Sequence, residues 1–95
     1  PYVIDIQAEE IALDGEVLKL TNKDFLVALC LFQNIGKPLS REFFLKEVWS
    51  VEAGLDTRTV DMHVSRVRRS LKLGPDRGLI IKTIYQHGYR LEKIS

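Results

Sequence analysis

The chain has 95 residues, of which 45% are hydrophobic and 28% are charged, so it is long enough for one folded domain with a core and too short for two. This composition excludes a disordered chain, and the longest apolar run, residues 25–32, is too short to span a bilayer. The sequence begins without Met or a signal-peptide pattern, and we expect a soluble, cytoplasmic domain excised from a longer protein.

The net charge of +1 hides an asymmetry along the chain. Residues 1–56 carry five basic and ten acidic side chains, whereas residues 57–95 carry nine basic and three acidic ones. A basic half of this kind is typical of nucleic-acid binding, although a solvated basic face is also common. The single Cys30 lies within an apolar run, which favours a small core residue in a reducing compartment.

The first 20 residues predict a small antiparallel sheet. Residues 2–6, 10–14 and 16–20 are rich in β-forming residues, and Asp14-Gly15 is a typical hairpin turn. The acidic side chains here have no metal-ligand spacing, and we interpret them as a solvated face.

Two helices are predicted next. Thr21 begins the first, with Asp24 three residues later in an approximate capping box, and the apolar run 25–32 predicts burial on nearly all sides. Gly36 ends this helix and Pro38 keeps the chain extended. Ser40 then caps a second helix, whose inward-facing residues we expect to be Phe44, Leu45 and Val48.

A third helix is predicted over residues 57–73, with Asp56 or Thr57 as N-cap and with Gly74 and Pro75 as its end. Its apolar residues share one stripe that requires a core: Val60, Val64, Val67 and Leu71. The opposite side carries Arg58, Met62, Arg66 and Arg69. This helix therefore has one buried face and one basic face.

The C-terminal part predicts a β-hairpin. Residues 79–84 and 89–94 are β-rich and are joined by residues 85–88, where we expect Gly88 to supply unusual backbone angles. Three helices followed by such a hairpin predict an α+β winged helix-turn-helix fold, in which the third helix fits the major groove of DNA.

Other chemistry has no support in the sequence. His63 and His87 lack partners at zinc-ligand spacing, and neither a phosphate loop nor a dinucleotide motif is present. Ser65 and His63 are two residues apart on one helix and point to different sides. We therefore expect no enzyme activity, no metal and no cofactor.

The strings LTNKDFLVALCLFQNIGKPLSREFFLKEVW, LDTRTVDMHVSRVRRSLK and IKTIYQHGYRL, in this order, resemble the OmpR/PhoB-type winged-helix domain, the DNA-binding output of bacterial response regulators. The resemblance covers essentially residues 1–95 as one domain. It implies an N-terminal sheet over 1–20, a three-helix core over 21–73 with a recognition helix at 57–73, and a wing over 79–94.

The resemblance also implies roles for single residues. Met62 and Arg66 take the positions that contact bases, although Met62 could instead be partly packed. Phosphate contacts are implied for Trp49, Arg58 and His63, with Arg69 and Tyr89 as further candidates. For three of these residues a purely structural role stays open as the alternative: Trp49 as a core aromatic, His63 as a satisfied boundary residue, and Tyr89 as core filling under the wing.

The sequence departs from the family pattern at two places. Many members carry an arginine at the wing that enters the minor groove, whereas this chain has Tyr85, Gln86, His87 and Gly88 there. The wing contacts are then left to Thr83, Tyr85, Gln86 and His87. Phe43 replaces a commonly polar residue and is either an exposed contact or an extra core residue, with the second favoured. We also expect Arg68 and Asp61, seven residues apart, to form an internal polar pair.

The implied partners are double-stranded DNA, a second copy on adjacent direct repeats, an upstream receiver domain and RNA polymerase. The polymerase contact would be the loop of Ser50, Val51, Glu52, Ala53, Gly54 and Leu55. The predicted function is thus sequence-specific DNA binding in transcriptional regulation. One alternative is a winged helix that binds protein, motivated by the missing wing arginine and by Phe43. The other is a ToxR-like regulator that is membrane-anchored and lacks a receiver.

Overall fold

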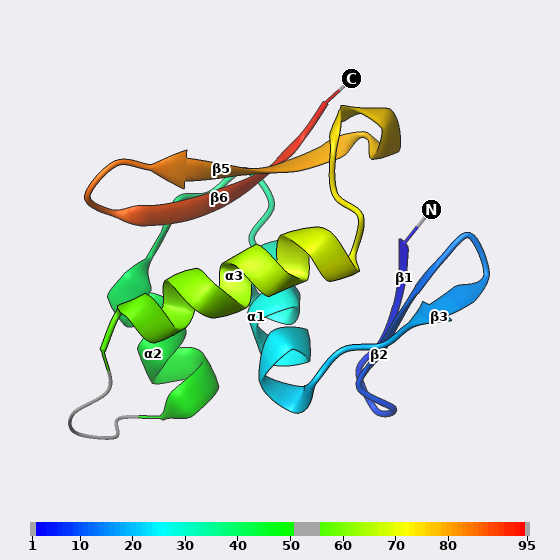
Figure 1. Cartoon of the computed structure of the whole chain (residues 1–95), viewed down its shortest axis with the longest axis horizontal. Helices are drawn as coiled ribbons and strands as arrows, with labels where there is room; N and C mark the ends of the chain where they lie inside the picture. Colours follow the sequence, from blue (N-terminus) through cyan, green and yellow to red (C-terminus); the bar gives the residue numbers. More distant parts are fainter. Residues whose placement is uncertain (1, 51–55, 95) are drawn as a thin grey trace.

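The computed structural model describes residues 2–50 and 56–94, and it shows three helices and two small antiparallel sheets (Figure 1). The predicted α+β winged-helix architecture is confirmed. The helices are α1 (Asn22–Gln33), α2 (Arg41–Trp49) and α3 (Arg58–Ser70), with a short 3-10 helix η1 (Pro75–Arg77) after them. Within the described ranges, no helix has the length and apolar character that crossing a membrane requires.

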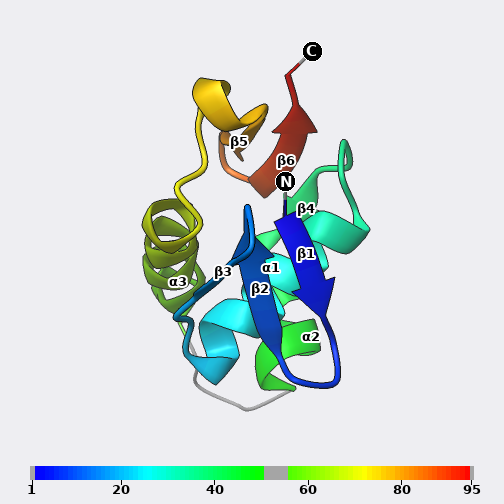
Figure 2. The same ribbon diagram turned by 90° about the vertical axis from the view of Figure 1, so that its right-hand side faces the viewer.

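The N-terminal sheet consists of β1 (Tyr2–Asp5), β2 (Glu10–Leu13) and β3 (Glu16–Leu18) in that order. Asp14 and Gly15 both have positive φ, at 52° and 87°, as a tight hairpin turn requires. Ile11 and Leu13 of β2 are buried, and the sheet lies over α1 (Figure 2). The Tyr2 hydroxyl donates to the carbonyl of Leu71, which ties this sheet to the end of α3.

Helix α1 begins as predicted, because the Thr21 hydroxyl accepts a hydrogen bond from the backbone N–H of Asp24 at 3.1 Å. The Asp24 carboxylate bonds to α3, so among the described contacts only this half of the expected capping box forms. Phe25 and Leu31 are almost completely buried, and α1 is the central packing helix that we expected.

A two-residue strand, β4 (Leu39–Ser40), was not predicted. It pairs with Tyr89 and Gly88 at the start of β6 (Gly88–Lys93), which in turn pairs with β5 (Leu79–Ile84), giving the order β4-β6-β5. The wing is therefore a three-stranded sheet.

We expected Gly88 to supply the unusual backbone angles of the hairpin turn, and this was wrong. Gln86, at φ 56°, supplies the positive angle in the turn, whereas Gly88 lies in strand β6. A Cβ at Gly88 would lie 1.9 Å from the carbonyl oxygen of Leu39. Glycine is needed here because β4 and β6 approach each other closely.

Helix α2 is capped by Ser40, whose hydroxyl accepts from the backbone N–H of Phe43 at 3.0 Å, as predicted. Phe44 and Val48 are buried and Leu45 is half-buried against the core. Phe43 is also half-buried, with its ring edge-on to Phe44. Of the two alternatives for Phe43, the structure shows the packed one.

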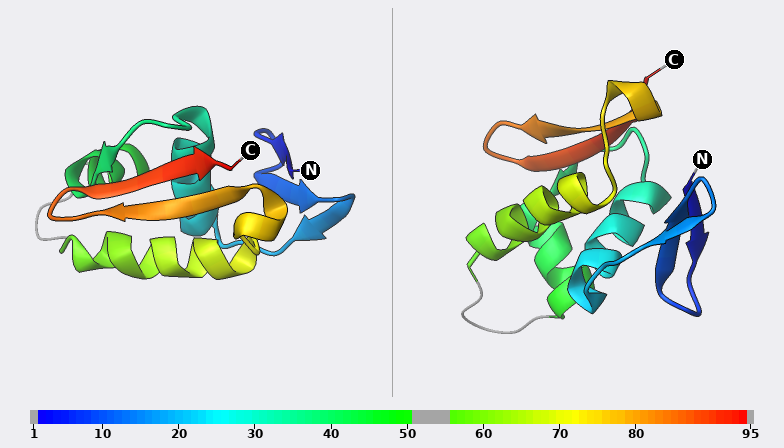
Figure 3. Two further views of the ribbon diagram at one scale, coloured as in Figure 1. Left: turned by 90° about the horizontal axis from the view of Figure 1, so that it is seen from above. Right: turned by 45° about the vertical axis from the view of Figure 1, so that its right-hand side comes forward.

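Helix α3 runs along the wing (Figure 3) and is shorter than the predicted 57–73. Its stripe of Val60, Val64, Val67 and Leu71 is fully buried, as expected. The Asp56 carboxylate accepts from the backbone N–H of Arg58 at 2.9 Å, whereas Thr57 makes no side-chain cap bond.

The end of α3 was predicted too late in the chain. Lys72 takes a left-handed conformation at φ 55° and donates its backbone N–H to Arg69, while the N–H of Leu73 donates to Arg68. These two backbone hydrogen bonds form a Schellman motif, which ends the helix before Gly74.

Candidate nucleic-acid interface

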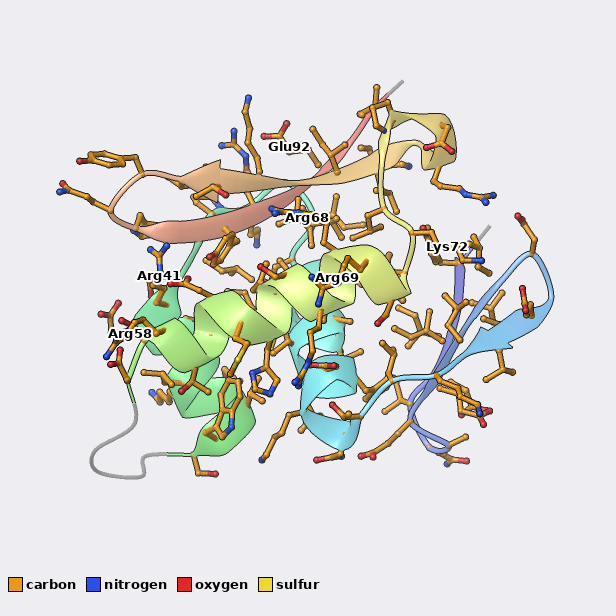
Figure 4. All side chains as sticks on the ribbon, viewed as in Figure 1. Arg41, Arg58, Arg68, Arg69, Lys72 and Glu92 are labelled. Carbon is orange, nitrogen blue, oxygen red and sulfur yellow. The ribbon has the colours of Figure 1, made fainter. Side chains whose placement is uncertain are left out.

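The outer face of α3 is exposed and basic. The side chain of Arg58 is 87% exposed, Met62 is 56% exposed, and Arg69 is exposed as well. Arg58 and Met62 are four positions apart, and Arg69 follows Met62 by seven, or about two turns, so the three residues share one face of the helix. Figure 4 shows Arg58 and Arg69 at intervals along α3, with Lys72 just beyond its end. The predicted basic face is thus open to solvent at Arg58, Met62 and Arg69.

Arg58 forms an ion pair with Asp56 at the protein surface. Its Nε and Nη2 donate to Oδ2 of Asp56 at 2.9 and 2.8 Å. The hydrogen bond to Arg58 lowers the pKa of Asp56, and the same bond raises the pKa of Arg58. Because the pair lies in water, a phosphate can replace the carboxylate at small cost.

Arg66 is held by an acid from another helix. Its Nε and Nη2 donate to the two carboxylate oxygens of Asp24 in α1, both at 3.1 Å. The Arg66 side chain is 38% exposed, whereas that of Asp24 is 5% exposed. Arg66 therefore lies at the edge of the outer face in a fixed orientation. We expected Asp24 to act only as a capping residue. The pair with Arg66 was not predicted, because 42 positions separate the two residues and no local spacing connects them.

His63 and Trp49 contact each other beside this pair. Their rings pack edge to face with centroids 4.9 Å apart, and the His63 side chain is 12% exposed. His63 Nδ1 is 2.8 Å from the carbonyl oxygen of Thr59, and Nε2 is 4.0 Å from Asp24. Trp49 is half-buried. The structure thus places His63 as a satisfied boundary residue and Trp49 partly in the core, and neither placement tests a phosphate contact.

Tyr89 is turned inward, with 6% of its surface exposed. Its hydroxyl donates to Oδ1 of Asp61 in α3, and Arg41 of α2 donates its Nε to the same oxygen at 2.8 Å. Burial, followed by the hydrogen bond to Asp61, raises the pKa of Tyr89. A phosphate contact by Tyr89 conflicts with this placement, because the hydroxyl is used to join the wing to α3. Of our two alternatives, core filling is the one that the structure shows.

The predicted pair of Arg68 and Asp61 was wrong. Arg68 Nη2 donates to the carbonyl oxygen of Ile81 in β5 at 2.9 Å, while Asp61 bonds Arg41 and Tyr89. Figure 4 shows Arg68 between α3 and the wing. Arg68 is directed toward the sheet, where a backbone carbonyl accepts its hydrogen bond, and the acid two helical turns away is paired with residues of α2 and the wing.

The wing tip projects beyond this network. Tyr85 is 85% exposed, and the other three predicted wing residues, Thr83, Gln86 and His87, are exposed too. The backbone N–H of Arg41 donates to the carbonyl of His87 at 3.1 Å, which ties the tip to the start of α2. Lys82 is also exposed on β5 and was missed as a candidate cation.

Of the predicted polymerase loop, only Ser50 is described; it is exposed and follows α2. Val51, Glu52, Ala53, Gly54 and Leu55 lie outside the described residues. Within residues 2–50 and 56–94, no group of three or more His, Cys, Asp or Glu side chains could hold a metal ion.

Comparisons with known proteins agree with this geometry. The family model described as "Transcriptional regulatory protein, C terminal" matches residues 15–91. The probable transcriptional regulator ycf27 of Galdieria sulphuraria is 39% identical over 93 residues, which are 96% of this chain and 36% of that protein. The chain thus spans little more than a third of this relative.

Two solved structures share the fold. The DNA-binding domain of Bacillus subtilis CssR has a TM-score of 0.83 and 34% identity, and the match covers 96% of this chain and 99% of that one. The DNA-binding domain of Klebsiella pneumoniae RstA, solved in complex with the RstA box, has a TM-score of 0.80 and 30% identity, covering 96% and 90%. The chain therefore belongs to the family of C-terminal domains of transcriptional regulatory proteins, the OmpR/PhoB-type winged-helix DNA-binding domains of response regulators, which are not enzymes.

Proposed function

We propose that this domain recognises a specific double-stranded DNA site by placing α3 in the major groove, as the output of a two-component regulator in the bacterial cytoplasm. The observation that carries the proposal is the exposed basic face of α3, held rigidly by its buried valine stripe. A helix about 10–12 Å wide fits a major groove about 12 Å wide. The RstA domain, a relative in fold and sequence, was solved on its DNA box.

The residues of the face divide into two tasks. Arg58 and Arg69 are exposed at opposite ends of α3 and contact phosphates, which position the helix. Met62 and Arg66 lie between them and contact base edges, where methyl and guanidinium groups can distinguish base pairs. Trp49 and His63 support the phosphate side of the interface, and His63 is positioned by Thr59.

The wing contributes contacts of another kind. Thr83, Tyr85, Gln86 and His87 reach the backbone through hydroxyl, amide and imidazole groups, without the arginine common at this place. Lys82 adds a positive charge on the same strand as Thr83. We expect the wing to add affinity with little sequence preference, because none of its tip residues presents a guanidinium fork to the minor groove.

Partners follow from the small size of one domain. A single recognition helix makes few contacts, so a second copy on an adjacent direct repeat would supply the missing affinity. The longer relative leaves room for an upstream receiver that controls pairing. We further propose that the loop after α2, beginning at Ser50, contacts RNA polymerase. The flanking sequence would distinguish a receiver-linked regulator from a membrane-anchored one.

A salt series tests the division of tasks. The cognate site is first selected from a random duplex pool, and binding is then measured on cognate and random duplexes. Arg66→Ala should lose roughly 1–3 kcal/mol on the cognate site alone. Arg58→Ala should weaken both duplexes alike and reduce the slope of log K against log salt by about one.

Lys19→Ala is the matched control, because Lys19 is an exposed cation that follows the N-terminal sheet. It should leave binding unchanged. Equal losses on cognate and random DNA for Arg66→Ala would remove its base-reading role, and binding that does not fall with salt would favour a protein-interaction module. Phe43 no longer supports that module, since its ring packs against the core.

A further inference from the structure

Asp24 is the one charged residue that is buried in the part of the chain that the structure describes, at 3% exposure. It lies in the first turn of α1, and its backbone N–H already bonds Thr21. Its carboxylate faces α3, where both oxygens accept hydrogen bonds from Arg66. Burying a carboxylate is costly unless it is paired and hydrogen-bonded, so this contact fixes Arg66 firmly.

The atoms used in this contact determine what Arg66 can still do. Asp24 takes one N–H of Nε and one of Nη2, which form one side of the planar guanidinium. The other side, formed by Nη1 and the second N–H of Nη2, still presents two parallel donors. Two parallel donors match O6 and N7 of guanine in the major groove. One arginine can therefore hold Asp24 and guanine at the same time.

We infer that Asp24 is a specificity-determining residue that buttresses Arg66 so that its free edge reads guanine. This inference rests on the proposed base contact of Arg66 and adds the base and the supporting residue. Adenine presents an amino donor where guanine has O6, so the fixed edge meets a donor and is rejected. The carboxylate also offsets the charge of Arg66, which reduces its attraction to phosphates of any sequence.

His63 also lies near the carboxylate, with Nε2 4.0 Å from Oδ1 of Asp24. That distance is too long for a hydrogen bond, and Nδ1 is occupied at the carbonyl of Thr59. Arg66 is thus the side chain that Asp24 directs.

The test uses the selected duplex, with each G·C pair in turn replaced by A·T or with guanine replaced by 7-deazaguanine, which lacks the N7 acceptor. We expect one guanine at which the wild-type domain discriminates by about 10-fold or more. Asp24→Asn should reduce that discrimination by about tenfold, while affinity for random duplex stays level or rises. Glu16→Gln, which removes one exposed carboxylate from β3, is the matched control and should change neither value.

Thermal unfolding of each variant separates lost specificity from lost folding. If Asp24→Asn does not fold, Asp24→Glu keeps the charge and displaces the carboxylate, and should show a smaller loss of discrimination. In an Arg66→Ala background, Asp24→Asn should have no further effect on guanine preference.

The outcomes distinguish this inference from the proposed function. If Arg66→Ala leaves guanine preference intact, the base contact itself fails. If Arg66→Ala removes the preference but Asp24→Asn retains it, the base contact stands and the buttress is refuted. Equal strengthening of cognate and random binding by Asp24→Asn also refutes it, because Asp24 would then only compete with DNA for Arg66.

Discussion

Replacing Gly88 by alanine tests the packing that holds the wing to the helices. The added Cβ would lie 1.9 Å from the carbonyl oxygen of Leu39, 2.9 Å from its carbonyl carbon and 3.0 Å from Cα of Ser40. All three atoms are backbone, so no side chain can rotate away. Reaching an ordinary contact of 3.4 Å requires β4 and β6 to separate by about 1.5 Å, which breaks the hydrogen bonds between them.

The cost can be estimated from what is lost. Two or three backbone hydrogen bonds disappear, including that from Arg41 to His87, at about 1 kcal/mol each. We therefore expect Gly88→Ala to lower the free energy of unfolding by about 3 kcal/mol, or the melting temperature by roughly 15 °C. Urea unfolding followed by circular dichroism measures the free energy, and calorimetry measures the melting temperature.

Gly36→Ala is the control, because Gly36 has φ 85° but an added Cβ there meets no atom within 4 Å. Its cost is backbone strain of about 1–2 kcal/mol. A Gly88→Ala variant that loses no more stability than Gly36→Ala would refute the close approach of β4 and β6.

Three further changes test other contacts. Val64→Ala, at a side chain 1% exposed, should cost about 2 kcal/mol in urea unfolding, and a loss below about 0.5 kcal/mol would contradict its burial. Tyr89→Phe should cost about 1 kcal/mol at pH 7, and the difference from wild type should shrink above the ordinary tyrosine pKa of 10.0, because the folded pKa of Tyr89 is raised and its contribution is lost as pH rises through it. Burial and Glu47 raise the pKa of Cys30 to about 11, so alkylation by iodoacetamide at pH 8 should be far slower in the folded than in the urea-unfolded protein; equal rates would contradict this.

Periodicity was sufficient to predict α3 and its buried face. Val60, Val64, Val67 and Leu71 repeat at helical spacing and all are buried, because one stripe of a helix must face the core. The caps at Thr21 and Ser40 were also predictable, since each acts on a backbone group three residues away.

Contacts between distant segments could not be predicted in this way. Asp24 bonds Arg66 across 42 residues, and β4 pairs with a strand almost 50 positions later, so neither leaves a local repeat. Arg68 was assigned to Asp61 by helical position alone, yet the wing carbonyl of Ile81 is its acceptor. Helical geometry gives the direction of a side chain, whereas the neighbouring element decides what it meets.

Lys72, which takes the left-handed position that ends α3, connects two competing requirements. Glycine would relax that backbone, and Lys72→Gly should make the domain more stable by about 1 kcal/mol. The same change removes an exposed cation from the end of the basic face. That cation also interacts favourably with the negative C-terminal pole of the helix dipole. Selection for thermal stability alone would therefore favour glycine at this position. Retention of lysine would indicate selection for binding a negatively charged ligand.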